Sequence, residues 1–337
     1  MGFFDEQETQ APPASVWDAQ APAASAPESA PAAPTAAPAD VSSGAADLTA
    51  GVVAPSSIGG FFGGLFGSSE APLVAKDTLA PLRDQIQLET AKIELKGKFK
   101  IGEGTGASND VSPEEFEKIA KLYGNIRDGK SDLRLTSDEA DPAKAAELKD
   151  KTLDDIGTML QTKTGRQLVG DLADNTTVDP KDPSKRVHRT TSIRMTDNPS
   201  LDNQCEPAGM REARRLRDMD SSNEIERTAG TPGVGTDAEV TYHPGESKTL
   251  RGTGVLATGD TTLFHELLHA QHATHGTRIR ADQRYQGAEG DVDNGVRAEE
   301  MATVGLAGSS GSSLTENAYR RERKVLDAKI EERLTYN

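Results

Sequence analysis

The strongest constraint on the fold is a change in composition near residue 75. Before it the chain is rich in Ala, Pro, Ser and Gly, so it cannot bury enough apolar surface to offset the entropy of ordering. We therefore expect residues 1–75 to form a disordered tail, with the run GGFFGGLFG at 59–67 as its one apolar island. Roughly 260 residues remain, which is enough for one sizeable core.

Charge and cysteine content exclude several classes of protein. The formal net charge is −16, so the chain is repelled by phosphate backbones and anionic membranes, and nucleic acid is not an expected partner. The single cysteine, Cys205, excludes a disulfide framework and a thiolate metal cage, and we interpret it as a passive surface or loop thiol. No apolar run is long enough to span a membrane, and residues 1–10 lack the features of a Sec signal peptide.

Periodicity predicts helices on both sides of a region of short extended runs. A helix with Ser112 as its N-cap and Pro113 in its first turn is the clearest in the first half of the folded part. The best strand candidates are RVHRTTSIRM (186–195) and AEVTYHP (238–244). Later helices are expected at about 260–275, 293–304 and 315–334. The order predicts an α+β fold with a small mixed sheet.

Residues 261–276, TTLFHELLHAQHATHG, contain four of the six histidines. We expect Asp260 to cap a helix that ends before Gly276. His265 and His269 are four residues apart, so a helix places both imidazoles on one face, where they can hold one metal ion. Glu266 then lies on the flank where water for hydrolysis would be. A catalytic zinc site needs a third protein ligand and one open position.

Two candidates for the third ligand follow in the sequence. His275 has the metzincin spacing, but that arrangement needs a glycine where this chain has His272, so we interpret His275 as a charge near the C-terminal end of the helix. The other candidate is the pair Glu299 and Glu300, which lies beside core-like Met301. A buried carboxylate there needs a cation. An exposed acidic helix face is the alternative.

The sequence resembles two families of zinc proteases. HELLHAQH followed by AEEMATVG is similar to the zinc site of the clostridial neurotoxin light chains, in which the second glutamate of the pair is the ligand. LFHELLHAQH, NGVRAEEMATVGL and LTENAYRRE resemble the NleD-like family of bacterial effector metalloproteases over roughly residues 110–330. The resemblance implies a zincin-like catalytic core at 176–337, preceded by a helical part at 76–175.

The resemblance also implies roles for individual residues. One zinc ion per chain would be held by His265, His269 and Glu300, with Glu266 as the general base. Glu299 is either a hydrogen-bond partner of a ligand histidine or an exposed residue.

Other roles follow from the same resemblance. Tyr319 and Arg320 are the candidates to stabilise the oxyanion, although the Arg-x-x-Tyr order of the light chains is absent. His272 is expected to support the site without binding the metal. The run 238–244 is expected to be the edge strand that pairs with an extended substrate, with Tyr242 as a structural residue.

These features predict a secreted or injected effector or toxin, a zinc metalloendopeptidase that hydrolyses a protein of a host or target cell. The resemblance implies signalling kinases as substrates. The tail at 1–75 is expected to serve export, by type III secretion or a contractile injection system. The alternative is a non-catalytic structural or cargo protein of an injection apparatus, with a structural or degenerate metal site.

Overall fold

The computed structural model describes residues 79–179, 182–250, 254–279, 285–287, 290–292, 295–306 and 313–334. These residues belong to one compact unit, Leu73–Asn337. The predicted disordered tail, 1–75, lies outside the described residues, and so does its apolar island. None of the described helices combines the length and the apolar character that a membrane span requires.

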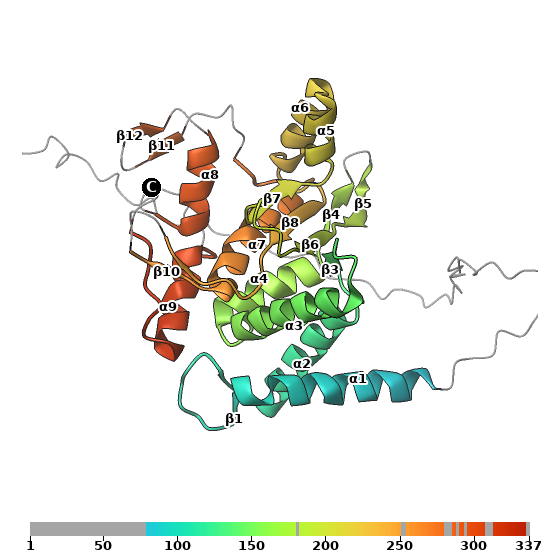
Figure 1. Cartoon of the computed structure of the whole chain (residues 1–337), viewed down its shortest axis with the longest axis vertical. Coiled ribbons are helices and arrows are strands. Elements are labelled where there is room, and N and C mark those ends of the chain that lie inside the picture. The colour runs from blue at the N-terminus through green and yellow to red at the C-terminus, as the bar shows by residue number, and fades with distance from the viewer. Residues whose placement is uncertain are drawn as a thin grey trace, which may run out of the picture. The chain divides into compact units, whose positions relative to one another are not determined.

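Helices form the first part of the described chain and lie together in Figure 1. They are α1 (Ala80–Leu95), a 3-10 turn (Lys96–Lys98), α2 (Pro113–Arg127), α3 (Pro142–Met159) and α4 (Lys163–Ala173), and a short parallel pair, β1 (Lys100–Ile101) and β2 (Asp110–Val111), separates α1 from α2. The predicted start of α2 is confirmed: the Ser112 side chain accepts a hydrogen bond from the Glu115 N–H at 3.1 Å, and Pro113 follows the cap.

A four-stranded mixed sheet forms the centre of the α+β fold, as predicted. Its strands lie in the order β3 (Leu133–Ser137), β6 (Thr191–Met195), β8 (Ala238–Tyr242) and β7 (Gln204–Pro207). The first three strands are parallel, and β7 runs antiparallel to β8. The run predicted at 186–195 is divided between β6 and β5 (Asp182–His188), which pairs with β4 (Thr176–Asp179).

The prediction that residues 238–244 form the edge strand is wrong. This run forms β8, which lies between β6 and β7 and buries its side chains on both faces of the sheet. Its sequence, AEVTY, alternates apolar and polar residues, which is typical of a half-exposed strand, so the sequence did not indicate the inner position. Tyr242 is fully buried, in agreement with a structural role, and the edge position belongs to β7.

Helix α7 (Gly259–His275) is the central helix of the fold (Figure 1). It packs against β7 and β8, and also against α3 and α4. Leu263, Phe264, Leu267 and Leu268 are all fully buried. A helix that is apolar on most of its surface is expected in the interior, and burial of these four side chains contributes roughly 6–12 kcal/mol.

The start of α7 differs from the prediction. The cap is Thr258, whose backbone N–H donates to the Thr261 hydroxyl at 2.9 Å, so the expected cap at Asp260 is wrong. Asp260 lies in the first turn and accepts hydrogen bonds from two side chains of a later helix. The end is as predicted, because Gly276 closes the helix with a φ of 71°.

The remaining elements are α5 (Met210–Leu216), α6 (Met219–Ala229), β9 (Lys248–Thr249), β10 (Leu256–Ala257), β11 (Tyr285–Gly287), β12 (Gly290–Val292), α8 (Gly295–Val304) and α9 (Glu316–Leu326). The helix predicted at 315–334 is shorter than expected, because Asp327 adopts extended backbone after α9. Both α8 and α9 pack against α7, and Figure 1 shows them on the same side of that helix.

Candidate metal centre

The structure brings together the three residues predicted to hold zinc. His265 and His269 lie one turn apart on α7, and their Nε2 atoms are 3.2 Å apart. Glu300 on α8 reaches both imidazoles: its Oε2 is 3.0 Å from Nε2 of His265, and its Oε1 is 3.3 Å from Nε2 of His269. One ligand atom from each residue lies within 4.8 Å of the others. Two imidazoles and one carboxylate are a suitable donor set for zinc and leave a position for water.

Glu299, the alternative third ligand, lies on the other side of the His269 ring. Its Oε1 is 3.1 Å from Nδ1 of His269 and 2.8 Å from Nδ1 of His272. Its Oε2 accepts a hydrogen bond from the Ile279 N–H at 2.8 Å. A carboxylate on Nδ1 fixes the orientation of an imidazole and leaves Nε2 for a metal. The geometry therefore favours Glu300 as the ligand and Glu299 as the partner that holds His269.

A further glutamate, which the sequence analysis missed, holds the other imidazole. Glu316 at the start of α9 is 1% exposed, and its Oε2 is 2.8 Å from Nδ1 of His265. It also accepts hydrogen bonds from Arg320 Nε at 2.5 Å and from Arg333 Nη1 at 3.1 Å. One carboxylate thus orients an imidazole and neutralises two buried guanidinium groups. In the sequence, the Glu-x-x-x-Arg spacing of ENAYR could have indicated an ion pair between Glu316 and Arg320 on one helix face.

These contacts set the protonation of the metal-free site. Burial lowers the pKa of His265, but Glu300 and Glu316 outweigh burial and raise this pKa to about 10. In His269, burial is likewise outweighed by Glu299 and Glu300, which raise the pKa to about 9. Burial raises the pKa of both Glu299 and Glu300, yet the imidazoles outweigh it and hold each pKa well below its usual range. A metal must therefore displace protons from the imidazoles.

Glu266 lies next to these residues with an uncommitted carboxylate. Its side chain is 8% exposed, and it has no hydrogen-bond partner within the described part of the chain. Burial raises its pKa, whereas the nearby imidazoles of His265 and His269 act to lower it. A carboxylate with a raised pKa and no competing partner is suited to act as a general base.

The proposed ligands line a cavity of about 300 Å³. Asn203 to Cys205, at the start of β7, form one wall, and Arg214 of α5 and Glu226 of α6 form another. Cys205 is 7% exposed within β7, so the expectation of a surface or loop thiol is wrong. Burial raises the pKa of its thiol, which keeps the thiol neutral.

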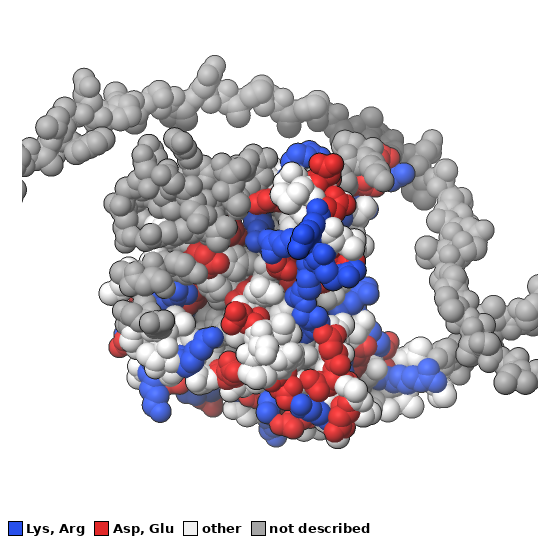
Figure 2. All heavy atoms as spheres, turned by 45° about the horizontal axis from the view of Figure 1, so that its top comes forward, with Lys and Arg blue, Asp and Glu red and all other residues white. Residues whose placement is uncertain are grey.

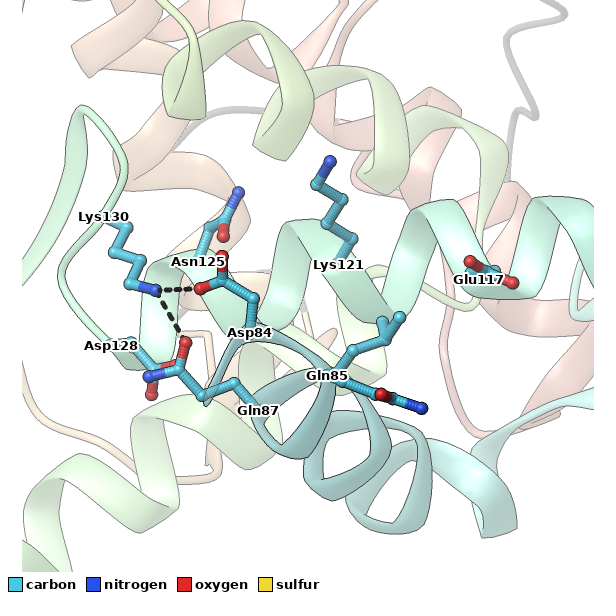
Figure 3. A pocket seen from close by; sticks show the side chains of 10 residues that line it. Asp84, Gln85, Gln87, Glu117, Lys121, Asn125, Asp128 and Lys130 are labelled. Atoms are coloured by element: carbon cyan, nitrogen blue, oxygen red, sulfur yellow. Dashed lines mark hydrogen bonds and ion pairs between the residues drawn. The ribbon is translucent and has the colours of Figure 1, made fainter. Parts of the chain in front are cut away.

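A larger cavity, about 570 Å³, lies beside α1 and α2 (Figure 3). Lys130 donates there to Asp84 Oδ1 at 3.0 Å and to Gln87 Oε1 at 2.6 Å. No histidine or cysteine is among the described residues that line it. It therefore offers no imidazole or thiolate for a zinc ion.

Both residues predicted to stabilise the oxyanion are buried in α9. The Tyr319 hydroxyl donates to Asp260 Oδ2 at 2.5 Å, and its ring stacks on Phe264 with centroids 4.2 Å apart. Arg320 donates to Glu316 and to two backbone carbonyls. These contacts attach α9 to α7 and to Glu316, which contacts His265. The oxyanion role of Tyr319 and Arg320 stays a prediction.

The other histidines have different surroundings. His275 lies in the last turn of α7, as expected, and burial lowers its pKa. His188, Asp132 and Asp174 form another group of potential ligands, but His188 and Asp174 are exposed, and His188 Nδ1 is 2.8 Å from Asp132. Exposed acidic groups of this kind are common without a metal.

A comparison with known protein families agrees with the sequence resemblance. The model of the Peptidase_M91 family, described as "Effector protein", matches residues 136–328, which is more than half of the chain. The crystal structure of the botulinum neurotoxin type D light chain is similar to this chain with a TM-score of 0.32 and 19% identity, over 57% of this chain and 51% of the light chain. The match thus spans about half the length of that light chain. No curated protein matches the sequence.

Proposed function

Because the chain belongs to the Peptidase_M91 effector protein family, as the sequence resemblance predicted, we propose that it is a zinc metalloendopeptidase injected into a target cell. The observation that carries the proposal is the uncommitted carboxylate of Glu266 beside His265, His269 and Glu300. The substrate is a protein of the target cell, and signalling kinases are the class that the resemblance implies. Residues 1–75 would engage the export apparatus.

His265, His269 and Glu300 would hold the zinc ion, which when bound polarises the scissile carbonyl and makes nearby water more acidic. Glu266 takes a proton from the attacking water and donates it to the leaving amine. Burial raises the pKa of Glu266, which makes its carboxylate a stronger base for this transfer. No other carboxylate of the cavity combines burial with the absence of a hydrogen-bond partner within the described residues.

Carboxylates from two helices position the ligand imidazoles in this mechanism. Glu316 holds Nδ1 of His265, and Glu299 holds Nδ1 of His269. Each contact directs the Nε2 lone pair of its imidazole toward the position between the ligands. Tyr319 adds support by fixing Asp260 in the first turn of α7.

We assign substrate pairing to β7, the edge strand beside the metal site. Within the described residues no strand pairs with its outer side, and residues 203–205 line the cavity that the ligands share. An extended peptide can add to such an edge through main-chain hydrogen bonds. The scissile bond would then lie alongside α7, within reach of Glu266.

The test measures zinc content and proteolysis with the full chain. Wild type, Glu266→Ala and the control Glu117→Ala, an exposed residue of α2, are compared for zinc by mass spectrometry. Each is then added to a host-cell lysate, in which new protein N-termini are identified. We expect one zinc per chain in all three proteins and new termini only with wild type and the control. Zinc without new termini would contradict the catalytic role, and absence of zinc would contradict the whole proposal.

A further inference from the structure

Two arginines line the cavity beside the metal site. Arg214 on α5 and Arg278, which follows α7, line the same cavity as Glu266. Figure 2 shows Lys and Arg side chains gathered on one face, in a chain whose formal net charge is −16. Four glutamates line the same cavity, so an anionic ligand would bind there only through direct contact with an arginine.

The backbone on both sides of the Arg278 side chain is fixed. The Arg278 N–H donates to the carbonyl of Ala229, the last residue of α6, at 3.3 Å. The next N–H, of Ile279, donates to Glu299 Oε2 at 2.8 Å. Arg278 is thus tied to α6 and to the carboxylate that holds His269. These contacts hold the backbone of Arg278 in place beside the cavity.

The Arg278 guanidinium has a donor without an acceptor. Its Nη1 is buried and has no hydrogen-bond partner within the part of the chain that the structure describes. Arg320 and Arg323, by contrast, each donate to a carboxylate. Glu299 in the same cavity is already engaged by two imidazoles and the Ile279 N–H. A buried charged donor without an acceptor is unfavourable unless a ligand supplies one.

We propose that Arg278 binds an anionic side chain of the substrate, a carboxylate or a phosphate, in the cleft next to the scissile bond. The inference rests on the proposed peptidase function only in naming the ligand a substrate. The planar guanidinium can present two parallel N–H donors to either anion. Arg214 adds positive charge to the same cavity, but it already pairs with Glu206, so Arg278 is the principal contact.

A binding experiment tests this without proteolysis. The zinc-loaded Glu266→Ala protein is titrated with fluorescent decapeptide libraries in which one position is fixed as Glu, Gln or phosphoserine, and anisotropy is recorded. We expect Glu or phosphoserine to bind roughly tenfold to a hundredfold more tightly than Gln at one position. The comparison of Glu with phosphoserine identifies which anion is preferred.

Arginine variants attribute the preference to one residue. Adding Arg278→Gln to the Glu266→Ala protein should remove the preference, and Arg278→Lys should retain part of it. The matched control is Arg215→Gln, because Arg215 lies on α5 near Arg214 but is exposed, pairs with Glu212 and does not line the cavity. Equal binding of Glu, phosphoserine and Gln peptides, or a preference that survives Arg278→Gln, overturns the inference.

Cleavage-site profiles separate this inference from the proposed function. Active wild type should produce termini with acidic or phosphorylated residues enriched at one position, and Arg278→Gln should lose that enrichment. Cleavage without any such enrichment rejects the Arg278 subsite and leaves the peptidase. Anion binding that depends on Arg278 in a protein that cleaves nothing supports the subsite and rejects the peptidase.

Discussion

Glu316→Gln tests whether one buried carboxylate supports both the fold and the metal site. Glu316 holds Nδ1 of His265 and accepts hydrogen bonds from Arg320 and Arg333. Glutamine keeps the shape and one acceptor oxygen but removes the negative charge. The imidazole then loses its orienting anion, and two buried guanidinium groups lose their counter-charge.

The structure allows a rough magnitude for each effect. Removing one partner from a buried ion pair lowers the free energy of unfolding by about 3–5 kcal/mol. Because glutamine keeps one acceptor oxygen, we expect a loss near the lower limit of this range. In a folded unit of this size that corresponds to a decrease in Tm of roughly 6–12 °C. Loss of a carboxylate that orients a ligand histidine weakens metal binding by about tenfold to a hundredfold. Thermal unfolding of the metal-free protein and zinc titration against a chelator measure the two effects separately.

The matched control is Glu322→Gln, on the same helix. Glu322 accepts hydrogen bonds from the Lys163 N–H and the Thr164 hydroxyl, both at 2.5 Å, at the start of α4. It has no contact with the ligand histidines, so this variant should lose stability and keep the zinc affinity of wild type. If Glu316→Gln and Glu322→Gln bind zinc equally well, the proposed coupling between Glu316 and His265 is refuted.

Three further predictions concern protons and backbone. Zinc binding at pH 7 should release about two protons, because the metal-free pKa values of His265 and His269 are about 10 and about 9. Titration calorimetry in buffers of different ionisation enthalpy counts the released protons, and no release would contradict the raised pKa values of both imidazoles. Both pKa values lie above the value near 6.5 that histidine has in the unfolded chain. The protonated imidazoles therefore contribute fully to the free energy of unfolding below pH 6.5, and this contribution is lost as the pH rises through 9 and 10. Chemical denaturation of the metal-free protein should therefore show a free energy of unfolding that decreases from pH 7 to pH 10. A free energy of unfolding that stays constant over this range would refute the prediction. Gly276→Ala should unfold or severely destabilise the protein, because its Cβ would lie 1.8 Å from the Thr231 carbonyl oxygen. The control is Gly129→Ala, at a similar φ but with open space around the added Cβ, which should lower the free energy of unfolding by about 1 kcal/mol in thermal melts.

The local features of the site were predictable because they depend on the helix repeat alone. Two histidines four residues apart lie on one face of any helix, so the proximity of His265 and His269 follows once α7 forms. The apolar residues between and around them predicted burial of that helix. The inner position of β8 was not predictable in this way, because AEVTY alternates apolar and polar residues, as a half-exposed strand does.

The surroundings of the site depend on contacts between distant segments. Glu316 reaches His265 across 51 positions of the sequence, and it does so only because α9 packs against α7. The unsatisfied donor of Arg278 becomes visible only when the other buried groups of the cavity have been assigned partners. Propensity also gave no indication of β7, whose four residues, Gln-Cys-Glu-Pro, contain no β-branched or aromatic side chain.

The ambiguity between Glu299 and Glu300 has a geometric cause. Adjacent residues of a helix point about 100° apart, so one of the pair would normally face a metal while the other faces away from it. Here α8 approaches α7 so that His269 lies between the two side chains, with Nδ1 near Glu299 and Nε2 near Glu300. Each carboxylate therefore contacts the same imidazole, and the sequence alone gives both equal access to a cation. The choice rests on His265, whose Nε2 contacts Glu300, while Glu299 is held instead by His272 and the Ile279 N–H.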